Sequence, residues 1–216
     1  MPRRNRVTPF GEIIPTPERG TFMGNRGILH DAEGHVKRAW QVKRWIVCVL
    51  EFRGRKRTVM TPGHYTELFF LDEATALAAG HRPCAECRHD RFIDFCNAWK
   101  LAHSPDGGSQ RPTATEIDNR LHAERLTADR TKRTYPADLG ELPDGVFVRH
   151  DSWGDDAYLV WGGGLHAWTA GGYTRRMARP KRAEVLVLTP ASTVRALRAG
   201  YIPAVHPSAR SRGGST

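Results

Sequence analysis

The sequence predicts an α+β fold, in which antiparallel hairpins and a cysteine-containing helical segment precede a C-terminal antiparallel meander or small barrel. Short runs of β-branched and aromatic residues, separated by glycine-containing turns, indicate strands in residues 27–60 and again in residues 146–188. Residues 91–101 and 114–125 instead place apolar side chains at helical spacing. With 216 residues, the chain is long enough to bury a real core as one domain or as two small ones.

Composition indicates how the chain is divided. Residues 104–113 are rich in Ser, Pro and Gly and are predicted to be a flexible linker. We therefore expect a basic α+β region in residues 1–103, and a connecting helix followed by strands in residues 114–205. The Ser-, Arg- and Gly-rich tail, residues 206–216, is predicted to be disordered.

The N-terminal region begins with predicted hairpins. Residues 27–40 indicate one hairpin that turns at residues 31–34. Residues 45–52 predict a buried strand, and Gly54 opens a turn into residues 56–60, which makes a second hairpin. Its tip carries four cations around one glycine, namely Arg53, Arg55, Lys56 and Arg57. Such a tip fits against phosphates without reading base sequence, although an exposed strand edge protected by charge has the same composition.

Positive charge is concentrated at the N-terminal end of the chain. Residues 1–60 hold 13 Lys or Arg against 5 Asp or Glu, so they carry +8 of the formal net charge of +10. This asymmetry is typical of a surface that binds a polyanion, with nucleic acid, and DNA in particular, as the first candidate. A solvated basic surface without a partner is the alternative interpretation.

Cysteine usage and hydropathy indicate the compartment. Four cysteines are too few for a disulfide scaffold at this length, and the N-terminus lacks the apolar stretch of a signal peptide. No apolar run approaches the length needed to span a bilayer, so we expect no membrane partner. The sequence therefore predicts a reduced protein of the cytoplasm.

Residues 68–87 carry the strongest local signature. Residues 68–71 are a short apolar run, Asp72 can cap a helix over residues 73–79, and Gly80 stands where the left-handed residue that ends a helix belongs. A proline then precedes Cys84 and Cys87, which predicts that both lie at or near the start of a second helix, over residues 91–101. Two thiolates three residues apart can hold one tetrahedral ion from a single turn.

This segment resembles the second half of the zinc-binding domain of Ada-type DNA alkylation-response proteins. The shared residues are Phe69-Phe70, Asp72-Glu73-Ala74, residues 76–84 and Cys87-Arg88, so the resemblance covers about residues 69–88. It implies one zinc ion held by the turn that carries Cys84 and Cys87, which we call the cysteine knuckle. It also implies DNA as a partner, with Arg82 and Arg88 beside this knuckle as contacts. The family's first cysteine pair, one member of which accepts a methyl group from a DNA phosphotriester, has no counterpart here, so methyl transfer is not implied.

Two further zinc ligands must come from outside this motif. Cys48 and His64 are the first choices, because they are the only soft ligands between Val42 and Phe70. A redox pair or two buried thiols are the alternatives to zinc. The rivals to Cys48 and His64 are Cys96, His81, His89 and His122, of which Cys96 is expected in the core.

The helix over residues 114–125 carries a second suggestive cluster. Thr113 and Glu116 form a capping box at its start. Asp118 and His122 are spaced i, i+4 and share one face, with Glu124 following, and such a set can do acid–base or metal-assisted work on a phosphate substrate. Intrahelical pairs on a solvated face explain the same residues more simply.

The C-terminal region is predicted to form several strands and a final helix. Strands are expected over residues 146–148, 157–161, 165–168 and 185–188, and a last helix over residues 193–199. Trp161, Trp168 and Tyr173, near Arg175 and Arg176, form either a base-stacking platform or part of a β core.

These observations predict a zinc-containing nucleic-acid-binding protein, in DNA repair, modification or regulation. One alternative is a metal-dependent enzyme acting on nucleic acid, a nuclease or a modifying enzyme, that uses Asp118, His122 and Glu124. Another is a protein-interaction module in which zinc only stabilises the fold.

Overall fold

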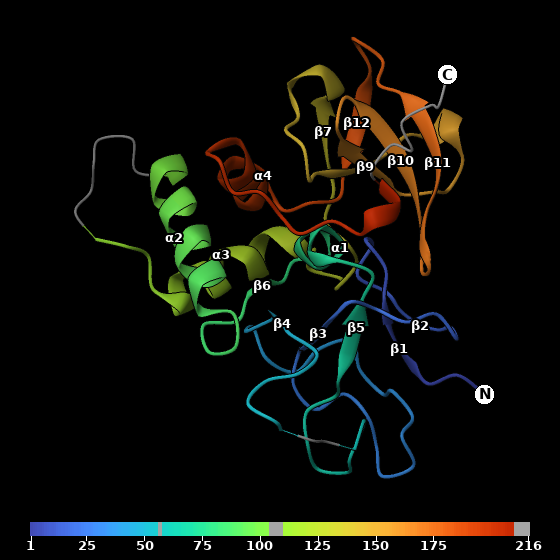
Figure 1. Ribbon diagram of the computed structural model, residues 1–216, viewed down its shortest axis with the longest axis vertical. Coiled ribbons are helices and arrows are strands. Elements are labelled where there is room, and N and C mark those ends of the chain that lie inside the picture. The colour runs from blue at the N-terminus through green and yellow to red at the C-terminus, as the bar shows by residue number, and fades with distance from the viewer. Residues whose placement is uncertain (56–57, 104–109, 210–216) are drawn as a thin grey trace.

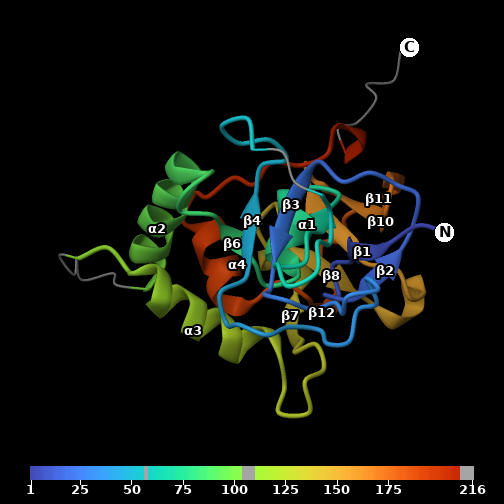
Figure 2. The ribbon, with the colours of Figure 1, turned by 90° about the horizontal axis from the view of Figure 1, so that it is seen from below.

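The computed structural model describes residues 1–55, 58–103 and 110–209, and it has an α+β fold built on two six-stranded sheets. In Figure 1 the N-terminal sheet lies below helix α1 (Glu73–Ala78) and the C-terminal sheet lies above it. Seen from below in Figure 2, helices α2 (His89–His103), α3 (Ala114–Arg125) and α4 (Ala191–Arg198) gather on one side of the molecule.

The N-terminal sheet is mixed and has the order β2-β1-β5-β3-β4-β6. Its pairs are antiparallel except β1 with β5 and β4 with β6, which are parallel. The strands are β1 (Arg4–Val7), β2 (Ile13–Pro15), β3 (Phe22–Asn25), β4 (Ile46–Cys48), β5 (Leu68–Phe70) and β6 (Arg82–Pro83).

Only the first of the two hairpins predicted in this region forms. Its turn closes where the sequence predicts, with the backbone N–H of Gly34 donating to the carbonyl of Asp31 at 3.1 Å, and His30 and Val36 form an antiparallel bridge beside it. The second hairpin is wrong because both edges of β4 are already occupied, one by β3 and the other by β6. Lys56 and Arg57, at its predicted tip, lie outside the described residues.

Helix α1 has the ends that the sequence predicts. The Asp72 carboxylate accepts a hydrogen bond of 2.8 Å from the backbone N–H of Thr75, which caps the helix. Gly80 has a φ of 91°, and a Cβ at this position would lie 2.6 Å from Cδ of Arg125. Because every residue of α1 is buried, the helix is a central element of the fold rather than a surface one.

Helices α2 and α3 also confirm the sequence prediction. Thr113 and Glu116 cap α3 reciprocally, and Ile117 and Leu121 are fully buried on its inner face. The backbone before α2 pairs with β4 as strand β6. The cysteine knuckle then lies in the turn that leads into α2, near the start of the helix as the sequence predicts.

The C-terminal sheet is antiparallel throughout and open, with the order β11-β10-β9-β8-β12-β7. Consecutive strands β8 to β11 pair in sequence order, which confirms the meander. The edge strand β7 carries Pro136, and a proline is tolerated at such an edge. The strands are β7 (Tyr135–Asp138), β8 (Phe147–Arg149), β9 (Tyr158–Trp161), β10 (Gly164–Thr169), β11 (Gly172–Ala178) and β12 (Glu184–Val187).

One core crosses the predicted linker. Phe95 of α2 and Leu121 of α3 belong to the same buried cluster as Val148 of β8, Val187 of β12 and Leu197 of α4. Residues 104–109 of the linker lie outside the described residues.

The start of the predicted tail is ordered. Residues 206–209 include a 3₁₀ turn at Pro207–Ala209, and Ala209 is 1% exposed, so disorder is wrong for these four residues. Further 3₁₀ turns lie at Leu139–Glu141 and Asp151–Trp153. None of the helices in the described part of the chain is both long and apolar enough to cross a membrane.

Candidate metal centre

Strand pairing brings Cys48 and Cys84 together. In the parallel pair of β4 and β6, Val47 is the register partner of Pro83, so the residues that follow them come side by side. The backbone N–H of Cys84 donates to the carbonyl of Val47 at 2.9 Å, which holds this alignment. The tertiary fold thus places next to each other two cysteines that are 36 positions apart in the sequence.

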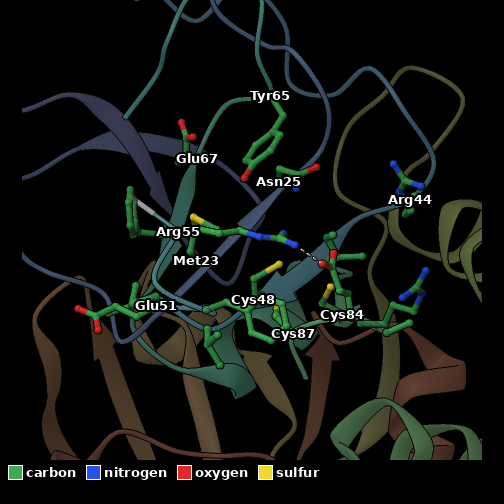
Figure 3. Close-up of a pocket in the computed structure, with 18 of the residues that line it drawn as sticks. Met23, Asn25, Arg44, Cys48, Glu51, Arg55, Tyr65, Glu67, Cys84 and Cys87 are labelled. Carbon is green, nitrogen blue, oxygen red and sulfur yellow. Dashed lines mark hydrogen bonds and ion pairs between the residues drawn. The ribbon is translucent and has the colours of Figure 1, made fainter. Parts of the chain in front are cut away.

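The turn before α2 adds the third cysteine. The backbone N–H of Arg88 donates to the carbonyl of Cys84 at 3.2 Å, which closes a turn that carries Cys87 back toward Cys84. The sulfur atoms of Cys48, Cys84 and Cys87 all lie within 4.8 Å of one another. Figure 3 shows the three sulfurs gathered at the wall of one cavity.

Hydrogen bonds among the thiols distribute the protons of this cluster. Thiols of Cys48 and Cys87 donate to the sulfur of Cys84, and these bonds lower the pKa of Cys84 to about 2. The pKa of Cys48 is raised, because its thiol is the donor to Cys84 and because burial penalises its charged form. These hydrogen bonds favour a thiolate on Cys84 over one on Cys48.

Three sulfurs in this arrangement can hold one metal ion. A zinc–sulfur bond is about 2.3 Å long, so three sulfurs that lie within 4.8 Å of one another can close around a single ion without rearranging the backbone. Thiolates favour soft or borderline ions, such as zinc or copper(I), over magnesium or calcium. The donor set fits the ion that the sequence predicts.

The other predicted ligands lie elsewhere. His64 is exposed, lines a separate small hollow with Thr58 and Thr61, and does not join the three cysteines, so its prediction is wrong. The backbone N–H of His64 donates to the carbonyl of Thr61 at 3.1 Å, which closes a turn within the loop before β5.

The rival ligands are also engaged outside the cluster. Cys96 is fully buried in the core, as expected. His81 is buried, with its ring 3.3 Å from the guanidinium of Arg26 and 3.2 Å from the Ala76 carbonyl. His89 is exposed and its ring contacts the carbonyl of Ala85.

The proposed acid–base residues of α3 are each engaged by a different partner. Asp118 accepts two hydrogen bonds, of 2.9 and 2.8 Å, from the buried guanidinium of Arg82. Glu124 accepts from the backbone and hydroxyl of Ser192 and from Arg120. The His122 ring lies 4.7 Å from the ring of Trp40, edge on, and 3.1 Å from Arg125. These contacts tie α3 to its neighbours.

Two of the arginines predicted to contact nucleic acid are structural. Arg82 is 2% exposed and bound to Asp118, and Arg88 is 7% exposed and forms an ion pair of 2.9 Å with the buried Glu73. Their guanidinium groups cannot reach a phosphate from this fold, so that prediction is wrong for both. Arg53 and Arg55 are exposed, and Arg55 forms an ion pair of 2.8 Å with Glu86.

The sequence carried no signal for the cavity that adjoins the cysteines. It has a volume of about 670 Å³ and is bordered by β3, β4, the loop after β4 and the knuckle. Its wall is largely apolar, with Met23, Ile46, Val49 and Phe69 among its residues. Residues with no shared motif meet here only because β3 and β4 are neighbours in the sheet.

Comparison with protein-family models, with curated proteins and with solved structures finds no match to this chain. The function is therefore argued from the site itself.

Proposed function

We propose that this is a zinc-binding protein that contacts nucleic acid, and that Cys48, Cys84 and Cys87 hold the zinc. The observation that carries the proposal is the convergence of three cysteine sulfurs within 4.8 Å. Intracellular sites with several cysteine ligands commonly hold zinc, which has no redox chemistry of its own and binds thiolates tightly. The resemblance of residues 69–88 to the Ada-type zinc-binding domain supports the same ion and adds DNA as a partner.

The distribution of exposed cations supports a nucleic-acid partner. Arg6 and Arg26 are buried and serve the fold, so they do not contribute to a binding surface. Arg44 and Arg55 line the cavity beside the cysteines, and Arg53 is exposed next to them. The exposed Lys and Arg among residues 1–55 are Arg3, Arg4, Arg19, Lys37, Arg38, Lys43, Arg44, Arg53 and Arg55.

Metal analysis of the purified protein tests the first half of the proposal. We expect about one zinc ion per chain, lost in Cys84→Ala because two sulfurs no longer hold the ion tightly. Cys96→Ala is the matched control, since Cys96 is equally a buried cysteine but lies in the core away from the cluster. Zinc that is absent from the wild-type protein, or retained in Cys84→Ala, contradicts the proposal.

Fluorescence anisotropy with labelled single- and double-stranded DNA tests the second half. Affinity should fall steeply as salt rises, and the double variant Arg53→Ala, Arg55→Ala should reduce the slope of log K against log salt by about two. Arg182→Ala, an exposed arginine of the C-terminal region, is the control and should leave the slope unchanged. A zinc-loaded protein with no salt-dependent affinity for DNA or RNA is instead a zinc-stabilised interaction module.

A further inference from the structure

We infer that the three-cysteine centre keeps one coordination position open to the adjoining cavity, and that this position takes a neutral nitrogen heterocycle from solution. The inference rests on the proposed metal site and concerns what that site binds. Coordination of this kind exchanges one donor, a water molecule, for another, a ring nitrogen, and no covalent bond of the ligand breaks.

Three cysteines leave a tetrahedral ion one ligand short. Within the described residues, no His, Asp, Glu or fourth Cys joins the group formed by Cys48, Cys84 and Cys87. Structural zinc sites are closed by four protein ligands, whereas sites with three protein ligands keep the fourth position for water or a bound molecule. The three cysteines therefore correspond to a site with three protein ligands and an open fourth position.

The three sulfurs face the cavity. Side chains alternate between the two faces of a strand, and Val47 of β4 is fully buried in the core with Leu68 and Phe70. Cys48, the next residue, therefore faces the opposite way, where it lines the cavity together with Cys84 and Cys87. An ion bound by the three sulfurs lies at the cavity wall, and its remaining position is reached from the cavity.

The size and lining of the cavity set the class of ligand. A volume of about 670 Å³ lies within the range of small-molecule sites. Apolar side chains dominate the wall and suit a flat ring, while Asn25 and Tyr65 add polar groups on the side that faces the cysteines (Figure 3).

Charge favours a neutral donor over an anion. The cavity is lined by three arginines and by three glutamates, so positive and negative side chains are equal in number. A divalent ion with three thiolates carries a net charge of −1, so a further anion would be repelled. A ring nitrogen brings a lone pair without a charge, and an unpaired nucleobase belongs to this chemical class. The six charged residues are Arg44, Arg55, Arg82, Glu51, Glu67 and Glu86.

Among the described residues that line the cavity, Met23 carries a further sulfur atom that could compete for the open position. It is the register partner of Cys48 across β3 and β4, it lines the cavity, and its thioether is a soft donor. Figure 3 shows its sulfur on the cavity side of the sheet, above Cys48. Zinc is rarely bound by a thioether, so we assign Met23 to the wall of the cavity and not to the metal.

Replacement of zinc by cobalt(II) in the full-length protein tests the inference, because cobalt d–d absorption reports the number and kind of ligands. Imidazole is the probe. We expect a saturable shift of the d–d bands, the same in Met23→Leu as in the wild type, and a weaker response to azide than to imidazole. Bands that imidazole leaves unchanged, a spectrum altered by Met23→Leu alone, or azide binding as tight as that of imidazole would each overturn the inference.

Two exposed leucines give a matched test of where the probe binds. Leu50 lines the cavity and is 49% exposed, whereas Leu101 lies on α2 and is 68% exposed. Leu50→Trp should weaken imidazole binding because the indole fills part of the cavity, and Leu101→Trp should leave it unchanged. Equal affinities in the two variants would place the probe elsewhere.

Failure of the metal site itself gives a different result. In that case cobalt does not bind to the wild-type protein, or it binds equally well to Cys84→Ala.

Discussion

Cys48 and His64 were equally plausible ligands in the sequence, and the fold separates them. Cys48 ends a strand whose parallel partner ends at the knuckle, so strand register brings its sulfur to Cys84 and Cys87. His64 lies in the loop between β4 and β5, and this loop rejoins the sheet only at Leu68. The sequence could indicate which residue types bind metal, but the pairing that selects between them is non-local.

Arg82 and Arg88 show that the role of a charged residue is equally hard to predict from the local sequence. Both were predicted as phosphate contacts because they flank the knuckle, yet each is paired with a buried carboxylate. Asp118, the partner of Arg82, lies 36 positions further along the chain. A buried charge needs such a partner, and only the fold shows where the partner is.

The proton distribution of the cysteine cluster predicts how metal affinity depends on pH. The pKa of Cys48 and that of Cys87 are raised while that of Cys84 is lowered, so we expect the metal-free cluster to keep protons on two of its three thiols. Metal binding releases both protons, so affinity should fall as pH falls, by about a hundredfold per pH unit where both thiols are protonated. Competition with a chromophoric chelator between roughly pH 6 and 8 measures this, and a flat profile would contradict it.

At the scale of single elements, helix α1 was predicted well because its signals are local. The cap at Asp72 and the left-handed Gly80 lie within one turn of the helix ends. What the sequence did not indicate is how the C-terminal end of this helix is covered. Arg125 donates to the carbonyl of Gly80 at 2.9 Å, and Lys132 donates to that of Ala78, so two side chains pair carbonyls that would otherwise be left without a partner at this end of the helix.

Gly80 should therefore be sensitive to substitution for two separate reasons. Gly80→Ala adds the cost of a left-handed conformation and a Cβ placed 2.6 Å from Cδ of Arg125. Gly200→Ala is the matched control, since Gly200 has a φ of 104° but nothing within 4 Å of its added Cβ. Urea unfolding should show a loss of about 1 kcal/mol for Gly200→Ala, and at least about 1 kcal/mol more for Gly80→Ala. Equal losses would mean that Arg125 moves aside freely.

At the scale of the whole molecule, the class of fold was predictable and the way its parts join was not. Runs of apolar residues and helix caps indicated α+β, and the C-terminal meander followed from its glycine turns. Strands β1, β2 and β3 were not predicted, and neither were β6 and β7. The last two are short and contain proline, so they form only where a neighbouring strand offers an edge. The division at residues 104–113 rested on composition, which does not report that Phe95 and Val187 share a core.

A shared core predicts that the chain unfolds in one step. Helices from before and after residues 104–109 pack together on the C-terminal sheet, so the loss of either part exposes the core of the other. Far-ultraviolet circular dichroism, which follows secondary structure, and tryptophan fluorescence should give coincident urea transitions. Two separate midpoints would instead support independent regions before and after the predicted linker.

The two carboxylates at the start of α1 have a consequence for synthesis of the protein. Asp72 accepts from Tyr173 and from the backbone of His206, while Glu73 accepts from Tyr201 and from the backbone of Ala204. These partners are translated more than a hundred residues after the helix that needs them. Asp72 can bind Thr75 and Glu73 can pair with Arg88 and Arg91 early in translation, but each acid lacks two of its hydrogen bonds until residues 173–206 have left the ribosome. The nascent chain can therefore close fully around this helix only at the end of translation.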